Sequence, residues 1–488
     1  MSNDLRAKVR SGVLWSAVQN WGVRLSSLLL FMVVARWLSP EQLGLFAAAT
    51  VVIAFLNLLS EQGLGEALVQ REEITQEQIN SVFWLNLGAS LLIVGLLWFV
   101  APLIAALMKL PELVPILRVV SLSMPLTAAS FGQLAMRRRR FEYRWLAKTV
   151  LASTMVSSMV ALAMLFAGLG VWSLVAQSLT TAAVISALLW IRPSWHLTMK
   201  TDFAATRPLM AYGAKRVSTS LLDFANTRYI ELFLASTLGP ASLGLYTVGV
   251  RVYQALMQVF SSTILEVAQN GFCRLSADRP GLIRAYFQSI AATAAIVMPV
   301  FILIAAVAPS LTVTLFGARW VASAEVTRWV AMLGAVQVLQ VYNGTVYNAI
   351  GRPGVGLQFM IFKVMLTFSA LFLARDAGLQ VLLQAYVASQ LATTPLSFWL
   401  VRRLIGVSLT QLFGTLWPYV LSSAFMALVA LGVASLLEAR GASAPLVLLG
   451  ACAAAVSVYL LCLQFFAPAA LQTGLRFLRP GRQPTAAA

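Results

Sequence analysis

Long apolar runs recur along the chain and set the first limit on its fold. A bilayer core about 30 Å thick takes roughly 20 apolar residues of helix to cross. Runs of this kind occur fourteen times, at 12–37, 42–64, 80–107, 114–135, 147–168, 171–191, 209–238, 243–266, 285–316, 326–350, 354–374, 379–400, 413–437 and 444–466. Only helices and closed barrels satisfy all their backbone polar groups in lipid. The runs therefore predict an all-α integral membrane protein with about fourteen transmembrane helices.

The composition agrees with a chain that lies in lipid. Hydrophobic residues make up 60% of the sequence and charged residues only 11%, whereas soluble proteins carry about 25% charged residues. The net charge of +18 would suit a nucleic-acid partner, but the basic residues fall mostly between the apolar runs, where they set membrane orientation. The three cysteines and the single histidine show no metal-ligand spacing. We expect no metal site and no nucleic-acid partner.

The basic residues also predict which side of the membrane each end faces. If the N-terminus is cytoplasmic, 22 of them fall in inside segments and 6 in outside segments. Cytoplasmic loops of membrane proteins carry such an excess of Lys and Arg. We therefore expect both termini to face the cytoplasm.

A short turn is written twice, 200 residues apart. Residues 35–46 read ARWLSPEQLGLF and residues 235–246 read ASTLGPASLGLY, with six of twelve positions identical. The first copy follows the first predicted span and the second follows the seventh, so six crossings separate two copies of the same orientation. This predicts parallel repeats, related by an axis along the membrane normal. The turns themselves read as tight outside hairpins; the alternative is that they also form the closing contacts of an outward gate.

A second pairing, of basic residues, supports this repeat. Arg137 and Lys148 flank one predicted inside loop, and Arg352 and Lys363 flank another, each pair eleven residues apart. Their offset predicts about fifteen inserted residues in the second half. We expect a six-helix bundle in 1–200, a second in 201–405, two extra transmembrane helices in 406–470 and a cytoplasmic tail in 471–488.

Several charged and polar residues lie inside the predicted spans, where a charge costs a few kcal/mol and should face a partner or a wet cavity. Polar stripes mark the first and seventh spans, because Asn20 and Arg24 share one helical face and Ser220, Asp223 and Asn226 share another. A central path lined by these helices would be net positive and would suit an anionic cargo. The residues predicted to line it are Arg24, Arg228, Arg251, Lys363, Asn20 and Asn226.

The alternative for some of these charges is structural. Arg228 and Glu231 are three residues apart and can pair with each other, while Lys215 and Arg216 can reach the membrane surface. The acidic candidates for coupling to an ion are Asp223, Glu231 and Glu61, although no spacing demands that role.

The run MRRRRFEYRW at 136–145 contains the densest basic cluster, Arg137, Arg138, Arg139 and Arg140. Such a loop is pinned to the cytoplasmic side beside anionic lipid headgroups. The alternative is that it captures a lipid diphosphate before entry. No phosphate-binding glycine loop, metal-ligand motif or nucleophile elbow is present in the sequence, so we expect no enzymatic activity.

Three stretches carry a resemblance to a known family: GVLWSAVQNWGVRLSSLLLFMVVARWLSPEQLGLF, LLSEQGLGEALVQREEIT and MRRRRFEYRWLAK. The chain resembles the polysaccharide transporter family, the Wzx-type oligosaccharide flippases of the MOP exporter superfamily, over at least residues 8–405. The resemblance implies flipping of an undecaprenyl-diphosphate-linked oligosaccharide across the bacterial inner membrane, by alternating access between two MATE-like bundles with a cationic lumen. It also implies a role for the two extra helices in holding a lipid tail.

The resemblance implies membrane lipids as partners, together with polysaccharide polymerase or assembly proteins, and no cofactor beyond a coupling proton or sodium ion. Two other functions are the alternatives. A cation-coupled MATE-type exporter of small molecules would favour an acidic lumen, and a membrane glycan polymerase or ligase would need a large outside loop. The predicted spans provide neither feature.

Overall fold

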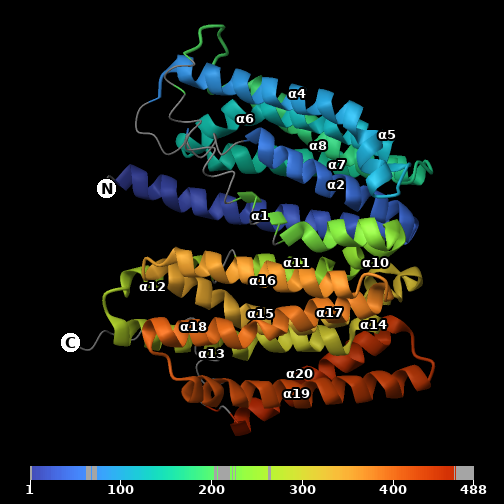
Figure 1. Ribbon diagram of the computed structural model, residues 1–488, viewed down its shortest axis with the longest axis vertical. Coiled ribbons are helices and arrows are strands. Elements are labelled where there is room, and N and C mark those ends of the chain that lie inside the picture. Colours follow the sequence, from blue (N-terminus) through green and yellow to red (C-terminus); the bar gives the residue numbers. More distant parts are fainter. Residues whose placement is uncertain are drawn as a thin grey trace. The chain divides into compact units, whose positions relative to one another are not determined.

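Figure 1 shows a computed structural model of the protein. The structure describes residues 3–61, 74–202, 227–261 and 265–466 and the single residues 68, 206, 220, 221, 224, 225 and 468. Within these ranges every regular element is a helix. Ten helical segments of the described chain are long and apolar enough to cross a bilayer. The chain is a multi-pass, all-α membrane protein, as predicted, while the count of fourteen spans stays a prediction.

The chain divides into two compact units, Met1–Thr247 and Val248–Ala488. The helices of the first unit are α1 (Asn3–Trp37), α2 (Pro40–Glu61), α4 (Gln76–Leu107), α5 (Leu113–Ser121), α6 (Ser123–Arg139), α7 (Tyr143–Phe166) and α8 (Trp172–Ile191). Residues 227–237 are also helical and lead into α10 (Gly239–Gly249), which the unit boundary divides. The predicted division into bundles at 200/201 is not tested by these units and stays a prediction.

The second unit continues with α11 (Arg251–Phe260), α12 (Glu266–Arg274), α13 (Arg279–Ala306), α14 (Ala308–Phe316), a 3-10 turn η2 (Ala318–Trp320), α15 (Ser323–Ala349) and α16 (Pro353–Leu373). It ends with α17 (Gly378–Ala392), α18 (Thr394–Ile405), α19 (Leu409–Ala439) and α20 (Ala444–Phe466). The last two match the predicted extra helices at 413–437 and 444–466. They pack on each other, α13 contacts α19 and α14 contacts α20. The Tyr459 hydroxyl donates to the Ala295 carbonyl at 2.7 Å.

Four predicted spans are each built from shorter helices. One of them, 243–266, is broken at Val250 between α10 and α11 with no proline nearby. The other three have a proline close to the break. Their breaks lie at Leu122 between α5 and α6, at Val307 between α13 and α14, and at Thr393 between α17 and α18. A proline follows each of these breaks by two or three residues, and it lacks the N–H that would continue the hydrogen-bond ladder. These prolines are Pro125, Pro309 and Pro395. The overlong ninth span is therefore interrupted near Pro309, while Pro299 lies inside the continuous α13.

The two halves repeat the same order of caps and turns. Thr75 caps α4 and Asp278 caps α13, each side chain accepting from a backbone N–H three residues later. Left-handed backbone follows at Lys109 and Gly317, and again at the next turn at Phe141 and Gly351. The two members of this last pair are 210 residues apart, compared with 200 for the repeated hairpin. The extra length of the second half is thus about ten residues up to this point.

The alignment of Arg352 with Arg137 is therefore wrong. Arg137 lies four residues before the left-handed residue of its turn, whereas Arg352 follows Gly351 directly. The conformation of a turn fixes where one helix ends and the next begins. A matching separation between two basic residues imposes no such constraint, so the pairing by charge was a coincidence of spacing.

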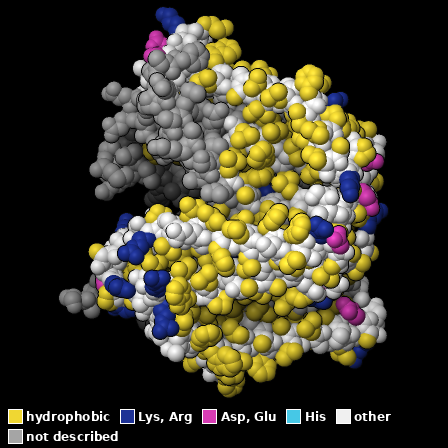
Figure 2. Space-filling model, in the orientation of Figure 1, with side chains coloured by type: hydrophobic (Ala, Val, Ile, Leu, Met, Phe, Trp, Pro, Cys, Tyr) yellow, Lys and Arg dark blue, Asp and Glu magenta, His cyan; other side chains and the backbone are white. Residues whose placement is uncertain are grey.

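Much of the molecular surface is apolar, as a lipid environment requires. Figure 2 shows hydrophobic side chains over the flanks of the helices. The side chains of Phe99 and Leu373 are 85% and 86% exposed. A water-soluble protein seldom leaves large contiguous apolar patches uncovered. The exposed flanks therefore fit helices that face acyl chains.

Candidate functional site

The repeated turns meet each other within the first unit. Gly44 of α2 and Gly244 of α10 are equivalent positions of the repeat. A Cβ atom built on Gly44 would overlap the carbonyl oxygen of Pro240, and one built on Gly244 would overlap that of Pro40. The contact is reciprocal, so each repeat places its glycine against the proline of the other. Only residues without a Cβ allow two helix starts to approach this closely.

Local hydrogen bonds hold the start of α2 in place at this crossing. The backbone N–H of Gln42 donates to the Ser39 hydroxyl at 3.3 Å, and the backbone N–H of Ser39 donates to the Gln42 side-chain oxygen at 3.2 Å. This reciprocal pair is a capping box, and Pro40 occupies the first turn, where its missing N–H costs nothing. The polar side chains of ARWLSPEQLGLF thus form the cap, while Gly44 forms the contact.

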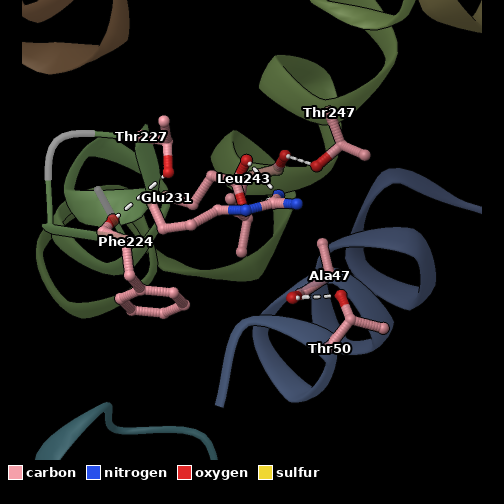
Figure 3. Close-up of polar contacts among 8 residues, drawn as sticks. Ala47, Thr50, Phe224, Thr227, Glu231, Leu243 and Thr247 are labelled. Atoms are coloured by element: carbon pink, nitrogen blue, oxygen red, sulfur yellow. Dashed lines mark hydrogen bonds and ion pairs between the residues drawn. The ribbon is translucent and has the colours of Figure 1, made fainter. Parts of the chain in front are cut away.

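A salt bridge lies just before the second copy of the turn. One guanidinium nitrogen of Arg228 is 2.9 Å from both carboxylate oxygens of Glu231. The Glu231 side chain is 11% exposed and that of Arg228 44% exposed, so the acid is the inner partner. Figure 3 shows Glu231 with Thr247 of α10 and Thr50 of α2, and α2 reaches this region through Phe55, whose ring is 5.5 Å from that of Phe224.

This ion pair answers one alternative from the sequence. Arg228 and Glu231 do neutralise each other locally, as three-residue spacing on a helix allows. The pair does not remove Arg228 from the candidate lining, because its side chain is nearly half exposed. Of the other predicted residues on this helix, Asp223 and Asn226 lie outside the described residues, as do Lys215 and Arg216.

On α1, Asn20 and Arg24 share one face, one turn apart, as predicted. Asn20 is exposed and Arg24 is half-buried. Only 17% of the residues in the most apolar part of this helix are buried inside the protein. Much of its surface can therefore face lipid or cargo. Glu61 is the last residue of α2, and its side chain lies outside the described residues.

The remaining two predicted cations lie in the second unit, apart from each other along the chain. Arg251 is the first residue of α11, directly after the break at Val250. Lys363 lies near the middle of α16 and is half-buried. That these cations and those of the first unit line one path stays a prediction.

A ladder of neutral polar side chains runs beside Lys363 and was not predicted. The Thr367 hydroxyl donates to the Lys363 carbonyl at 2.8 Å and accepts from the Gln390 amide at 3.0 Å. Gln337 links Gln390 to α11, since it receives the Tyr253 hydroxyl at 2.5 Å and donates to Gln390 at 3.4 Å. The ladder thus connects α11, α15, α17 and α16.

A second part of the ladder joins α15 to α18. The Asn343 amide donates to the Ser397 hydroxyl at 2.8 Å and its oxygen accepts from the Tyr286 hydroxyl at 2.7 Å. Gln337, Gln340 and Asn343 follow one another at three-residue spacing on α15. That spacing is a readable sign of a polar helical face, but the partners on the other helices are not evident from the chain alone.

The four arginines at the turn between α6 and α7 lie in different environments. Arg137 is buried, and its guanidinium binds Glu142 at 2.7 Å and donates to the Arg192 carbonyl. Arg139 is half-buried and donates to the Leu68 carbonyl at 3.4 Å. Arg138 and Arg140 are exposed. The run is thus one structural arginine with a charged rim rather than four equivalent ligands.

Comparison with known proteins adds the family. A family model described as "Polysaccharide biosynthesis protein" matches residues 33–325, which is more than half of the 488 residues. The chain belongs to this family. The expected relationship to polysaccharide biosynthesis proteins is thereby confirmed.

The relatives of this polysaccharide biosynthesis family member extend over most of its length. It is 22% identical to the teichuronic acid biosynthesis protein TuaB of Bacillus subtilis, over 98% of this chain and 99% of that protein. It is 23% identical to the lipopolysaccharide biosynthesis protein WzxC of Escherichia coli, over 86% of each. The succinoglycan biosynthesis transport protein ExoT of Rhizobium meliloti is 28% identical over 66% of this chain and 65% of its own length.

Solved structures confirm the fold of the family member. The lipid II flippase MurJ, in an inward closed conformation, superposes with a TM-score of 0.73 at 13% identity and covers 94% of this chain and 99% of its own. A multidrug resistance MATE transporter of the MOP superfamily gives 0.52 at 14% identity and covers 81% and 94%. At these identities the likeness establishes the MATE/MOP fold and not the cargo.

Proposed function

We propose that the protein is a flippase that moves an undecaprenyl-diphosphate-linked oligosaccharide from the cytoplasmic to the periplasmic leaflet of the bacterial inner membrane. The product would serve exopolysaccharide, capsule or O-antigen synthesis. One observation carries this proposal: the chain matches relatives named for polysaccharide biosynthesis and transport, and the first covers nearly its whole length. The protein is a transporter and not an enzyme.

The reciprocal contact between Gly44 and Gly244 supports transport by alternating access. It joins equivalent positions of the two predicted repeats, and at each of them a glycine lies against a proline backbone carbonyl. Two rigid repeats that touch at such a point can separate and meet again without repacking a core. We propose that this crossing closes the outer end of the path and that both termini face the cytoplasm.

The cargo proposal assigns the cations to the diphosphate. Guanidinium groups bind phosphate oxygens through paired hydrogen bonds, and an exposed face such as that of Arg228 can offer them. We propose that Arg24, Arg228, Arg251 and Lys363 contact the diphosphate, with Asn20 and Asn226 on the sugars. A coupling proton or sodium ion, held by Asp223, Glu231 or Glu61, is part of the same proposal. Polysaccharide polymerase or assembly proteins would receive the product.

The direct test is deletion of the gene followed by analysis of the lipid-linked glycans. We expect one undecaprenyl-diphosphate oligosaccharide to accumulate on the cytoplasmic side, where an added outside glycan-modifying enzyme cannot reach it, and the plasmid-borne gene to restore export. Accumulation of the same lipid on the outside would indicate a block in polymerisation and would contradict a flippase. Normal export with altered drug resistance would favour the MATE-type exporter instead.

A further inference from the structure

The turn between α6 and α7 holds a side chain that its backbone conformation disfavours. Phe141 has a φ of 59°, in the left-handed region that L side chains rarely adopt. The equivalent turn between α15 and α16 has Gly351 there, with a φ of 70°. Glycine adopts this conformation freely. A phenylalanine at this point is therefore not explained by the needs of the turn.

Burial does not explain Phe141 either. Its side chain is 44% exposed, and its one ring contact in the described chain is with Tyr143, at 6.1 Å between centroids. An aromatic ring at the tip of a turn between two membrane-length helices, Leu113–Arg139 and Tyr143–Phe166, lies at the bilayer surface. Aromatic side chains are enriched at that depth because one part of the ring can enter the acyl region.

The charges around Phe141 differ in what they contact. Glu142 is the acid of this turn, and the buried Arg137 binds it. Arg138 and Arg140 are exposed, and no carboxylate of the described residues forms a salt bridge with either. Two further cations stand nearby on aromatic rings, with Arg144 5.5 Å from the Trp15 ring centre and Arg192 5.6 Å from that of Trp145.

We propose that this turn is a binding site for an anionic phospholipid of the bilayer, with Phe141 inserted among the acyl chains and Arg138 and Arg140 on the headgroup phosphate. The backbone of the turn is held in place, because the buried Arg137 binds both Glu142 and the Arg192 carbonyl. The exposed part of the turn combines two arginines with an apolar ring. The arginines match the anionic headgroup of a charged lipid, and the ring matches its acyl chains. The inference does not depend on the proposed cargo.

The test uses the full-length protein in detergent, titrated with phosphatidylglycerol or phosphatidylcholine and followed by native mass spectrometry. Arg138→Gln/Arg140→Gln should weaken phosphatidylglycerol binding about tenfold or more and leave phosphatidylcholine binding unchanged. The matched control is Arg402→Gln/Arg403→Gln, which removes two exposed arginines from the end of α18 and should preserve phosphatidylglycerol binding. An equal loss in this control would overturn the assignment.

Phe141→Gly gives a second and opposite signature. It should weaken phosphatidylglycerol binding about fivefold, as loss of an inserted aromatic group predicts, and raise the melting temperature in lipid-free detergent, because glycine fits the left-handed turn. A lower melting temperature with unchanged lipid binding would show that Phe141 is a packing residue. The same variants are also titrated with farnesyl diphosphate, a soluble prenyl diphosphate probe. If they lose binding of this probe but keep phosphatidylglycerol binding, the site captures cargo and the phospholipid proposal is overturned.

Discussion

At the scale of single residues, the charged side chains in the apolar segments divide by what they contact. Arg118 donates to the Trp98 carbonyl at 3.0 Å and lies over its ring, so it is accommodated by its neighbour. Arg228 is paired with Glu231 but remains accessible on one side. A guanidinium in such a position can be structural, functional or both, and a single substitution cannot separate these roles.

A pair of variants can separate them for Arg228. Arg228→Ala leaves the mostly buried Glu231 carboxylate unpaired, which should reduce the free energy of unfolding by about 1–3 kcal/mol and lower export. Arg228→Ala/Glu231→Gln removes the uncompensated charge and should restore the melting temperature in detergent. Because the proposed diphosphate contact and one proposed coupling carboxylate would both be missing, polymer export should stay at least about tenfold below wild type.

The comparison is read from export normalised to membrane-inserted protein. Recovery of export together with stability in the double variant would show that Arg228 acts only as the partner of Glu231. Arg328→Ala is a suitable control, because Arg328 forms the same kind of three-residue pair with Glu325 at 2.8 Å on α15 and is not a candidate for cargo binding.

At the scale of elements, the hairpins carry two functions in one short sequence. The Ser39 and Gln42 side chains cap α2, and Gly44 makes the approach to Pro240. The repeat could be read from the chain as two hairpins of equal orientation. Their contact could not, because it depends on how α2 and α10 are brought together across some 200 residues of sequence.

Gly44→Ala tests the crossing. The added methyl group would overlap a backbone carbonyl, which cannot turn away as a side chain can. The starts of α2 and α10 should then be held apart, and export should fall severalfold while the protein still inserts in the membrane. Cysteine accessibility measured from the outside, at a position introduced near Pro240, should rise.

Gly95→Ala provides the control, since a Cβ at Gly95 of α4 meets nothing within 4 Å. It should export normally. Wild-type export and unchanged accessibility in Gly44→Ala would mean that the helices adjust without consequence, and the crossing would then be a tight hairpin contact with no part in closure.

The polar ladder is the other feature that belongs to the elements. Asn343→Leu would remove the acceptor of the Tyr286 hydroxyl and the donor to Ser397, all three being buried. Hydrogen bonds between helices in membranes contribute about 0.6–2 kcal/mol each. We expect a loss of about 1–3 kcal/mol in unfolding free energy, seen as a lower melting temperature in detergent.

Ser435→Ala is the reference for that measurement, because the exposed Ser435 hydroxyl bonds only within its own helix, to the Gly432 carbonyl at 2.9 Å, and should leave stability unchanged. If Asn343→Leu were as stable as the wild type, the ladder would contribute nothing that leucine packing does not replace.

At the scale of the whole molecule, the fold follows from a pattern that repeats. Most of the described helices overlap the predicted apolar runs, and the described halves show the same sequence of caps and left-handed turns. The runs alone missed the breaks near Pro125, Pro309 and Pro395, since hydropathy does not register a lost backbone donor. Proline positions, read together with the runs, would have placed them.

Orientation is the whole-molecule property that the charge distribution predicts. Fusions of green fluorescent protein to the C-terminus should fluoresce and fusions of alkaline phosphatase there should be inactive, because both termini are expected in the cytoplasm. A phosphatase fusion in the turn after residue 109, predicted to be outside, should be active. The reverse pattern would invert the membrane orientation and with it the proposed outer location of the Gly44 crossing.

The sequence by itself determined the class of the protein, an all-α multi-pass membrane chain, and the family to which it belongs. These follow from the length and order of apolar runs, which act locally along the chain. Only the tertiary structure decided that Arg137 reaches the Arg192 carbonyl, that Asn343 of α15 binds Tyr286 and Ser397, and that Gly44 and Gly244 meet the opposite prolines. The physical reason is that such contacts depend on which helical faces are brought together, and this is settled by packing between segments distant in sequence.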